Sequence, residues 1–327
     1  MRFYWLQIFA PGATTPYRTW TSHPNGVLDP GALNIEVDAI TAPAALPGGA
    51  ATVSVHGVSL NDLRQAYTWG MGGGDTTQGA GYTLKLYAGM AKGLPLANPN
   101  QAGLILQGMV MQAFGNWEGT EMAIEFVVSA PAYTPENPGN FVLNWRAGTS
   151  LSSALADCLS IAYPKVPQSI NLSPDLVLSH DQIDAKTTLE GLGIWLRDFT
   201  QSQFNNPVYV GMQAGAIVAW DDTHTPAPKS IAFTDLVGQP TWIDVLTMQI
   251  KLVMRADIAM GDVVTLPEGL QSNPGIVLTQ QAAAPSQLKY QSTFTGSFIV
   301  QQVRQVGNYR TPDGSAWVTI INCLLNA

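Results

Sequence analysis

The sequence contains few charged residues. Asp, Glu, Lys and Arg together make up 12% of the 327 residues, about half of the roughly 25% that is usual in soluble proteins. Free domains seldom leave so much uncharged surface in water. We therefore expect a surface that relies on Asn, Gln, Ser, Thr and Gly, and that is partly covered by other subunits.

Basic residues are especially scarce. The chain has 15 Lys and Arg, no two of them adjacent, and its net charge is −8. A protein that grips nucleic acid must neutralise phosphates with positive charge. This composition argues against a nucleic-acid-binding protein, but it is compatible with a channel through which DNA slides without being bound.

Cysteine is nearly absent. The two cysteines, Cys158 and Cys323, are far apart in the sequence and have apolar neighbours. We expect two buried free thiols and neither a disulfide nor a metal site. This expectation fits a protein that is assembled in a reducing cytoplasm.

No hydrophobic run is long enough to cross a membrane. The uncharged stretch at residues 93–117 is interrupted by prolines and amides. At the N-terminus Arg2 precedes an apolar run, as in a signal peptide, but that run is short and contains Gln7. We predict a first β-strand there and no stable membrane insertion.

Common catalytic and nucleotide-binding motifs are also missing. The sequence contains neither G-x-S-x-G nor H-E-x-x-H. The glycine-rich segment at 70–81 has no G-x-G-x-x-G register and precedes a predicted strand. A phosphate site would need a helix N-terminus at that point. We expect a connection or an intersubunit contact there.

The remaining candidates for chemistry are mostly acidic. Residues 221–224 (Asp-Asp-Thr-His) gather hard metal ligands without a second ligand group nearby, so we expect a solvated hairpin tip. Glu118 with Glu121, or Asp181 with Asp184, could in principle form the carboxylate pair of a glycoside hydrolase, but we expect them to be acids of surface turns. The nine tryptophans are mostly expected in cores or interfaces. We predict no catalytic, cofactor-binding or metal-binding residue.

β-Strand signals fill both ends of the chain. Apolar and polar residues alternate at 33–38, 52–56 and 245–254, and each such strand should bury one face. Residues 267–285 are predicted to form an extended loop. Caps and apolar periodicity predict helices at 59–67, 151–162 and 187–201, and strand signals follow at 208–210 and 216–220. These elements predict a first β-domain at 1–145, a small α+β domain at 146–228 and a second β-domain at 229–327.

Two segments share one order of features. Residues 104–128 and 294–321 each contain a β-rich arm, a Gly-Asn-aromatic triplet, a short polar turn and a second β-rich arm. The triplets end at Trp117 and Tyr309. Two copies are too few for a solenoid. We therefore predict two similar β-domains in which these hairpins occupy matching places.

Longer sequence patterns resemble a known family. Residues 235–267 contain Asp-Leu-Val-Gly-Gln-Pro-Thr-Trp-Ile, the alternating strand Thr-Met-Gln-Ile-Lys-Leu-Val-Met, and Arg-Ala-Asp-Ile-Ala-Met-Gly-Asp-Val-Val-Thr-Leu-Pro. This region resembles the second barrel of baseplate hub proteins from long-tailed bacteriophages. Near the N-terminus, Leu-Asn-Ile-Glu-Val-Asp, Val-His-Gly-Val-Ser-Leu-Asn-Asp-Leu and Gln-Gly-Met-Val are similar to the first barrel of those proteins. The resemblance covers most of the chain and is weakest at 70–103 and 268–288.

The resemblance implies both a fold and an assembly. The implied fold is mainly β, with two tail-tube-like β-barrels and a small α/β domain. The implied assembly is a homotrimer whose six barrels form a pseudo-sixfold ring between the sixfold tail tube and the threefold central spike. The implied partners are tail tube or distal tube-initiator proteins, the spike, the tape measure protein and surrounding baseplate proteins. DNA would pass through the lumen without specific binding, and an acidic chain suits a lumen that repels phosphate.

We therefore predict a non-enzymatic structural protein of the virion, located in the tail baseplate and assembled in the bacterial host cytoplasm. The sequence ends soon after its second hairpin, so we expect the spike to be a separate protein. Two alternatives stay open. One is a tail-associated peptidoglycan-degrading enzyme that uses Glu118 or Glu121, and the other is a carbohydrate-binding distal tail protein that uses exposed tryptophans.

Overall fold

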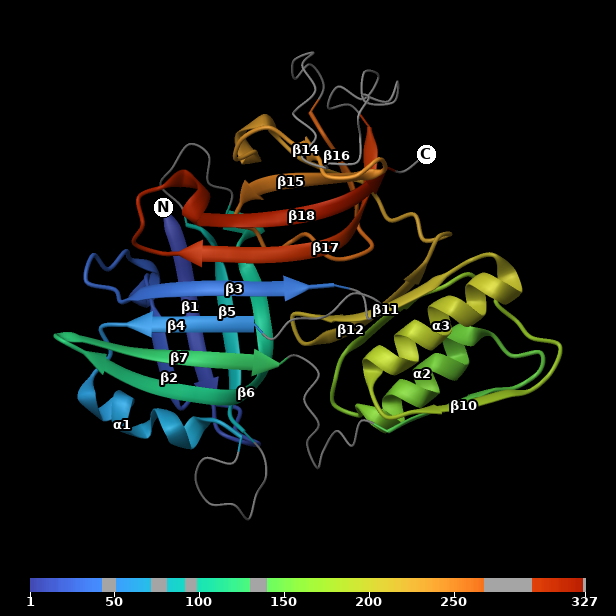
Figure 1. The fold of residues 1–327 in the computed structure, drawn as a ribbon, viewed down its shortest axis with the longest axis horizontal. Coiled ribbons are helices and arrows are strands. Elements are labelled where there is room, and N and C mark those ends of the chain that lie inside the picture. Colours follow the sequence, from blue (N-terminus) through green and yellow to red (C-terminus); the bar gives the residue numbers. More distant parts are fainter. Residues whose placement is uncertain (43–50, 72–80, 92–98, 130–139, 268–295, 326–327) are drawn as a thin grey trace.

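The computed structural model describes residues 1–42, 51–71, 81–91, 99–129, 140–267 and 296–325 (Figure 1). The predicted glycine-rich connection at 70–81 and the predicted loop at 267–285 lie almost entirely outside the described residues. The strands are β1 (Arg2–Phe9), β2 (Arg18–Thr21), β3 (Asn34–Thr41), β4 (Ala51–His56), β5 (Thr83–Met90), β6 (Gly103–Glu118), β7 (Glu121–Ser129), β8 (Phe141–Trp145), β9 (Gln168–Asn171), β10 (Gln182–Lys186), β11 (Val208–Gln213), β12 (Ala216–Asp221), β13 (Lys229–Ser230), β14 (Thr241–Trp242), β15 (Thr247–Val253), β16 (Val263–Thr265), β17 (Ser297–Asn308) and β18 (Trp317–Leu325). The α-helices are α1 (Leu60–Trp69), α2 (Leu151–Ala162) and α3 (Leu189–Phe204). The predicted mainly β fold is confirmed.

The three helices begin close to where the sequence predicts, because side-chain caps satisfy the free amides of their first turns. The Ser59 hydroxyl accepts a hydrogen bond from the Asp62 amide at 3.2 Å, and the Thr188 hydroxyl accepts one from the Gly191 amide at 2.9 Å. Helix α2 has its predicted bounds, whereas α1 and α3 continue two and three residues beyond theirs. Within the described ranges, no helix is long and apolar enough to cross a membrane.

In the part of the chain that the structure describes, a 13-stranded sheet joins the two β-rich ends. Its main path runs β14-β15-β18-β17-β3-β4-β7-β6-β5-β1-β2, and β13 and β16 join it beside β17. In Figure 1 the strands from β15 to β7 lie side by side, and β3 and β4 cross in front of β1 and β5. Strands β17 and β3 pair antiparallel over 303–308 and 36–41. The first β-rich region (residues 1–129) and the second (residues 229–325) therefore share one continuous sheet.

The main path contains the same four-strand arrangement twice. The strands β14-β15-β18-β17 are followed by β3-β4-β7-β6, and each set contains one of the two predicted hairpins. Each hairpin has one extra residue, Gln301 in β17 and Met111 in β6. Before this bulge, β17 pairs with β16 and β6 pairs with β5. After it, β17 pairs with β3, while among the described strands the end of β6 pairs only with β7.

The two hairpins correspond in their strand partners but not in their Gly-Asn-aromatic triplets. Counted from the bulges, Gln112 corresponds to Gln302, so Asn116 corresponds to Val306. The triplets are therefore two residues out of step, and aligning them with each other was wrong. The order of strands and bulges, which depends on long-range pairing, preserves the repeat better than the three matching letters do.

The described residues form three apolar cores. The first belongs to the first β-rich region, yet it includes Met254 and Trp317 from the other end of the chain. The second lies under α2 and α3 and includes Phe141, Leu143 and Trp145 of β8. The third fills the second β-rich region. Because side chains of the second β-rich region enter the core of the first, the limits of the three predicted domains stay a prediction.

The small sheet β11-β12-β9 joins the helices to the second β-rich region. Val208 and Val210 point into the core under the helices, while Tyr209 and Trp220 pack on the third core. The side-chain amide of Gln213 donates to the Ile258 carbonyl at 3.0 Å and accepts from the Met260 amide at 2.8 Å. Apolar packing and hydrogen bonds together fix the small α+β region to its neighbour.

Candidate functional site

The long sheet has one buried apolar face and one polar face. Along β3, for example, Ile35 and Val37 enter the first core while Glu36 and Asp38 point to the opposite side, as expected from strand alternation. We call that opposite side, from β15 to β6, the polar face. Its polar members are Asn34, Glu36, Asp38, Thr52, Ser54, His56, Gln112, Asn116, Glu118, Glu121, Glu125, Thr247, Gln249, Lys251, Gln302, Arg304, Asn308 and Asn322.

Charge is distributed unevenly over the polar face. The four strands β3, β4, β7 and β6 carry its five carboxylates, together with His56. The strands β15, β18 and β17 carry Lys251 and Arg304 among amides and apolar residues. The polar face is therefore net acidic, and its negative charge lies on the first β-rich region.

An ion pair and a side-chain hydrogen bond hold together the junction of the two four-strand sets on this face. The Arg304 guanidinium donates two hydrogen bonds to the Asp38 carboxylate, at 2.8 and 2.5 Å, from β17 to β3. This hydrogen bonding raises the pKa of Arg304. On the same two strands the Asn308 amide donates to Glu36 at 2.7 Å. The junction is thus closed by side chains as well as by backbone pairing.

An uncharged row of amides crosses β17, β18 and β15. The Asn322 side chain donates to Gln302 at 2.7 Å and accepts from Gln249 at 3.2 Å. These amides satisfy part of one another's hydrogen-bonding capacity and carry no net charge. The row itself contributes no positive charge that would hold a phosphate backbone, and Lys251 and Arg304 lie beside it on β15 and β17.

Behind the junction, a buried charge network braces the second β-rich region. Arg255 is 3% exposed. Its guanidinium contacts the Asp235 carboxylate at 3.0 Å and donates two hydrogen bonds of 2.7 Å to Asp257. Burial opposes its charge, but the bonds to Asp257 and the charge of Asp235 outweigh it and raise the pKa of Arg255. This network could not be predicted from the sequence, where its signal was the Arg-Ala-Asp order after an alternating strand.

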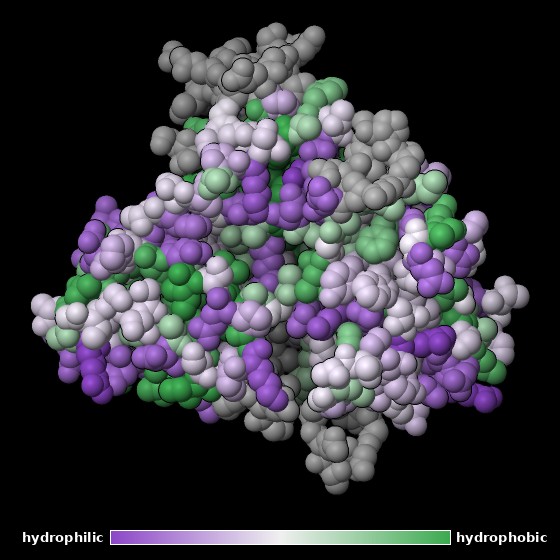
Figure 2. All heavy atoms as spheres, turned by 180° about the vertical axis from the view of Figure 1, so that it is seen from behind, coloured by the Kyte–Doolittle hydropathy of each residue, from purple (hydrophilic) through white to green (hydrophobic). Residues whose placement is uncertain are grey.

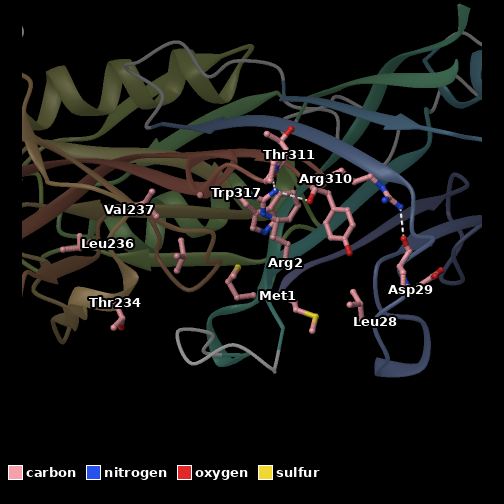
Figure 3. Close-up of a pocket in the computed structure, with 16 residues that line it drawn as sticks. Met1, Arg2, Leu28, Asp29, Thr234, Leu236, Val237, Arg310, Thr311 and Trp317 are labelled. Atoms are coloured by element: carbon pink, nitrogen blue, oxygen red, sulfur yellow. Dashed lines mark hydrogen bonds between the residues drawn. The ribbon is translucent and has the colours of Figure 1, made fainter. Parts of the chain in front are cut away.

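A cavity of about 700 Å³ lies at one end of the junction, between the N-terminus, residues 234–237 and the turn of the second hairpin (Figure 3). Its lining is largely apolar and includes Leu236, Val237 and Trp317. The Arg2 guanidinium donates to the carbonyls of Asn308 and Thr311 in that turn. Because Arg2 is engaged with main-chain oxygens, we assign it a role in holding the turn.

The structure brings together one of the two carboxylate pairs considered above. Glu118 and Glu121 face each other across the tip of the first hairpin, and both are exposed. Glu121 accepts a hydrogen bond from His56 at 2.8 Å. A neighbouring pocket of about 520 Å³ is lined by Glu121 but not by Glu118. The two carboxylates therefore do not converge on one cleft.

The other two candidates have local structural roles. Asp181 accepts the Ala147 amide at 2.8 Å, and Asp184 pairs with Lys186 at 3.0 Å. Asp221 is 1% exposed, which corrects the prediction of a solvated tip at this residue. Its carboxylate accepts hydrogen bonds from neutral donors that close the end of β12: the Ser173 and Thr223 amides, the Thr223 hydroxyl and the Asn206 side chain.

Most tryptophans pack in cores, as predicted. Trp20, Trp69, Trp145, Trp220, Trp242 and Trp317 are buried. Two are exposed, Trp5 at 39% and Trp117 at 62%, and they lie on different elements, β1 and the tip of β6. In Figure 2 apolar residues also interrupt the polar surface of the face turned away in Figure 1. This surface agrees with the low charge of the sequence.

Comparison with solved structures identifies the fold. A tail protein from Neisseria meningitidis MC58 is 9% identical, with a TM-score of 0.50 over 99% of this chain and 97% of that one. The 43 kDa tail protein of prophage MuSo2 from Shewanella oneidensis is 8% identical, with a TM-score of 0.51 over 99% and 98%. No known family matches the sequence, and neither does any curated protein. The chain thus has the fold of these tail proteins, and identities this low establish the fold alone.

Proposed function

We propose that this protein is a non-enzymatic structural hub of a phage tail baseplate, which works as a homotrimer. The observation that carries the proposal is the doubled four-strand arrangement in one continuous sheet. We interpret each arrangement as part of one tube-like barrel, with domains at 1–145 and 229–327 separated by the small α+β domain at 146–228. Two similar barrels per chain allow three chains to present six.

The two outer ends of the doubled arrangement complement each other. Inside the chain, the end of β17 pairs with β3. By repetition, the end of β6 in one copy is placed to pair with the β14 edge of the next copy. Such a head-to-tail contact generates a ring when the rotation closes. It also removes two open sheet edges, which otherwise invite uncontrolled pairing.

In this ring the polar face lines the central channel, because β1, β2 and β5 cover the other side of the first β-rich region (Figure 1). Its carboxylates repel DNA phosphates, and its amide row offers no cation to retain them. DNA and a tape measure protein would pass through, while tube proteins, the spike and other baseplate proteins would bind the ends and the outside of the ring.

Disulfide trapping tests the arrangement. Within one chain, Val306 on β17 pairs with Asp38 on β3. Counted from the bulges, Asn116 corresponds to Val306 and Thr241 corresponds to Asp38. In the proposed ring, Asn116 of one copy therefore lies opposite Thr241 of the next. We expect Asn116→Cys with Thr241→Cys to give covalent trimers under mild oxidation. The matched control, Asn116→Cys with Gln249→Cys, moves the second thiol one strand inward, beyond disulfide reach.

Light scattering of the purified wild-type chain, and imaging of particles that contain it, should give three copies per ring. A stable dimer, or a copy number other than three in the particle, would overturn the proposed hub. Cross-linking that is equal in the test pair and the control pair would contradict the pairing of β6 with β14.

A further inference from the structure

The tips of the two hairpins have different surroundings. The second tip is docked on the first β-rich region, where the Tyr309 amide donates to the Ile35 carbonyl at 2.9 Å. The Tyr309 ring meets Tyr4 edge-on at 4.9 Å, and Arg310 donates to the Pro30 carbonyl at 3.0 Å. The turn of the second hairpin thus binds the chain segment that leads into β3.

Among the residues that the structure describes, the first tip has no such dock. Trp117 lies one residue beyond Asn116 on β6 and is 62% exposed. Its indole N–H donates to the Gly119 carbonyl of its own turn at 3.0 Å. Across the hairpin, Trp117 faces Met122 as Gly307 faces Trp317. Each hairpin therefore carries one tryptophan in this matching cross-strand pair. The tryptophan of the second hairpin, Trp317, is 2% exposed and is buried in the first core.

A receiving segment corresponding to the one before β3 exists in the second β-rich region. Leu236 forms a bridge with Leu252, as Ile35 pairs with Val55. Thr234, Leu236 and Val237 line the 700 Å³ cavity of Figure 3. The pocket at the matching place in the first β-rich region is the 520 Å³ pocket described above, which Leu33 and Asn34 line. Arg310 of the docked second tip lies at the border of that pocket.

We propose that the tip of the first hairpin, led by Trp117, docks in the next copy of this chain against Thr234–Val237 at the mouth of this cavity. The inference rests on the proposed ring and specifies the residues that close it. The apolar side chains of Leu236 and Val237 suit an indole, and a tryptophan buried at an interface is a frequent hot spot. The same docking that joins the two regions within one chain then joins successive chains.

Trp117→Ala tests the docking in the full-length chain. We expect trimer formation, followed by sedimentation over a concentration series, to weaken by at least about 30-fold, as for an interface hot spot. Trp117→Phe should retain most of the association. Trp5→Ala, which removes the other exposed tryptophan from β1, should leave the trimer unchanged. Circular dichroism checks that each variant is folded.

A mixing experiment distinguishes a lost contact from a variant that fails to fold. Val237→Asp alters the receiving segment, so on its own it should also lose the trimer. Trp117→Ala mixed with Val237→Asp should form a heterodimer through the one intact contact, since Trp117 of the second variant meets Val237 of the first.

The outcomes separate this inference from the proposed hub. A trimer of unchanged affinity in both Trp117→Ala and Val237→Asp would overturn the docking while leaving the hub in place. A wild-type chain that forms no trimer would overturn the hub. Loss of the trimer in each variant without heterodimer formation in the mixture would also contradict the head-to-tail dock.

Discussion

The guanidinium of Arg255 is enclosed by protein, and its charge is balanced only by buried or half-buried carboxylates. Removing one partner of a buried ion pair is costly because the other charge is left without compensation. Asp235, which is 8% exposed at its side chain, would be in that position. The network also accepts hydrogen bonds from Gln305 and Thr319 at the Arg255 carbonyl, so it links β17 and β18 to the segment after β15.

We predict that Arg255→Met lowers the free energy of unfolding by about 3–5 kcal/mol. Urea denaturation followed by circular dichroism measures it. Arg304→Met is the matched control, because it removes an arginine from an ion pair that is largely exposed, with an expected cost below about 1 kcal/mol. Equal losses for the two variants would contradict a buried network at Arg255.

The two thiols should be inert while the protein is folded. Burial raises the pKa of Cys158 to about 11, although a hydrogen bond from the Val142 backbone acts in the opposite direction. Burial also raises the pKa of Cys323. A raised thiol pKa keeps the reactive thiolate scarce at pH 8, and burial blocks the reagent. Ellman's reagent should modify neither thiol in buffer at pH 8 and both in guanidinium chloride. Rapid modification in buffer would show that one of these sites is open.

At the scale of elements, helix α1 packs against β6 at a glycine. A Cβ atom on Gly115 would lie 2.7 Å from the Leu63 carbonyl oxygen, which is backbone and cannot rotate away. Helix α1 and β6 must therefore separate if this glycine is replaced. That contact also positions the end of β6, the proposed edge for the next copy.

Gly115→Ala should lower the free energy of unfolding by about 1–3 kcal/mol, the usual cost of overpacking. Gly314→Ala is the control, since a Cβ atom there would meet nothing within 4 Å and its φ is not positive. Thermal unfolding of both variants compares the two sites. A neutral Gly115→Ala would mean that α1 can move away from β6 without cost.

The elements that could be predicted from the sequence are those whose signals are local. Capping residues, Ser59 for α1 and either Thr187 or Thr188 for α3, predicted helix starts, and alternation predicted β3, β4 and β15. The pairing of β17 with β3 could not be predicted, because it joins residues more than 260 positions apart and no local pattern specifies it. Of all the features of the structure, the candidate site was the one that the sequence predicted least completely. Alternation at 33–38 indicated that one face is polar, but only the strand order shows that seven strands assemble those faces into one surface.

At the scale of the whole molecule, the proposed channel function depends on the sign of the charge on the polar face. Glu118, Glu121 and Glu125 carry much of its negative charge on β6 and β7. Replacing all three with lysine would reverse that charge while leaving the cores untouched.

We expect the wild-type chain not to retain duplex DNA at low salt, and the triple lysine variant to bind it with an affinity that falls steeply as salt rises. A control with lysine at Asp175, Glu190 and Asp198, exposed positions of the small α+β region, changes the net charge equally away from the polar face. Fluorescence anisotropy of labelled DNA compares them. Equal binding by both variants would mean that net charge alone, and not its place on the polar face, governs contact with DNA.

The burial of Trp317 in the first core has a consequence for synthesis. A ribosome releases the first β-rich region long before it releases β18, so the first core stays incomplete until Trp317 has been synthesised. Chains cut short by premature termination would then stay unfolded and open to proteolysis, as pulse-labelling of a truncation before residue 296 can show. Quality control would thus be built into the order of folding, because only a chain that has reached β18 could offer the edges by which, in the proposed ring, one copy recruits the next.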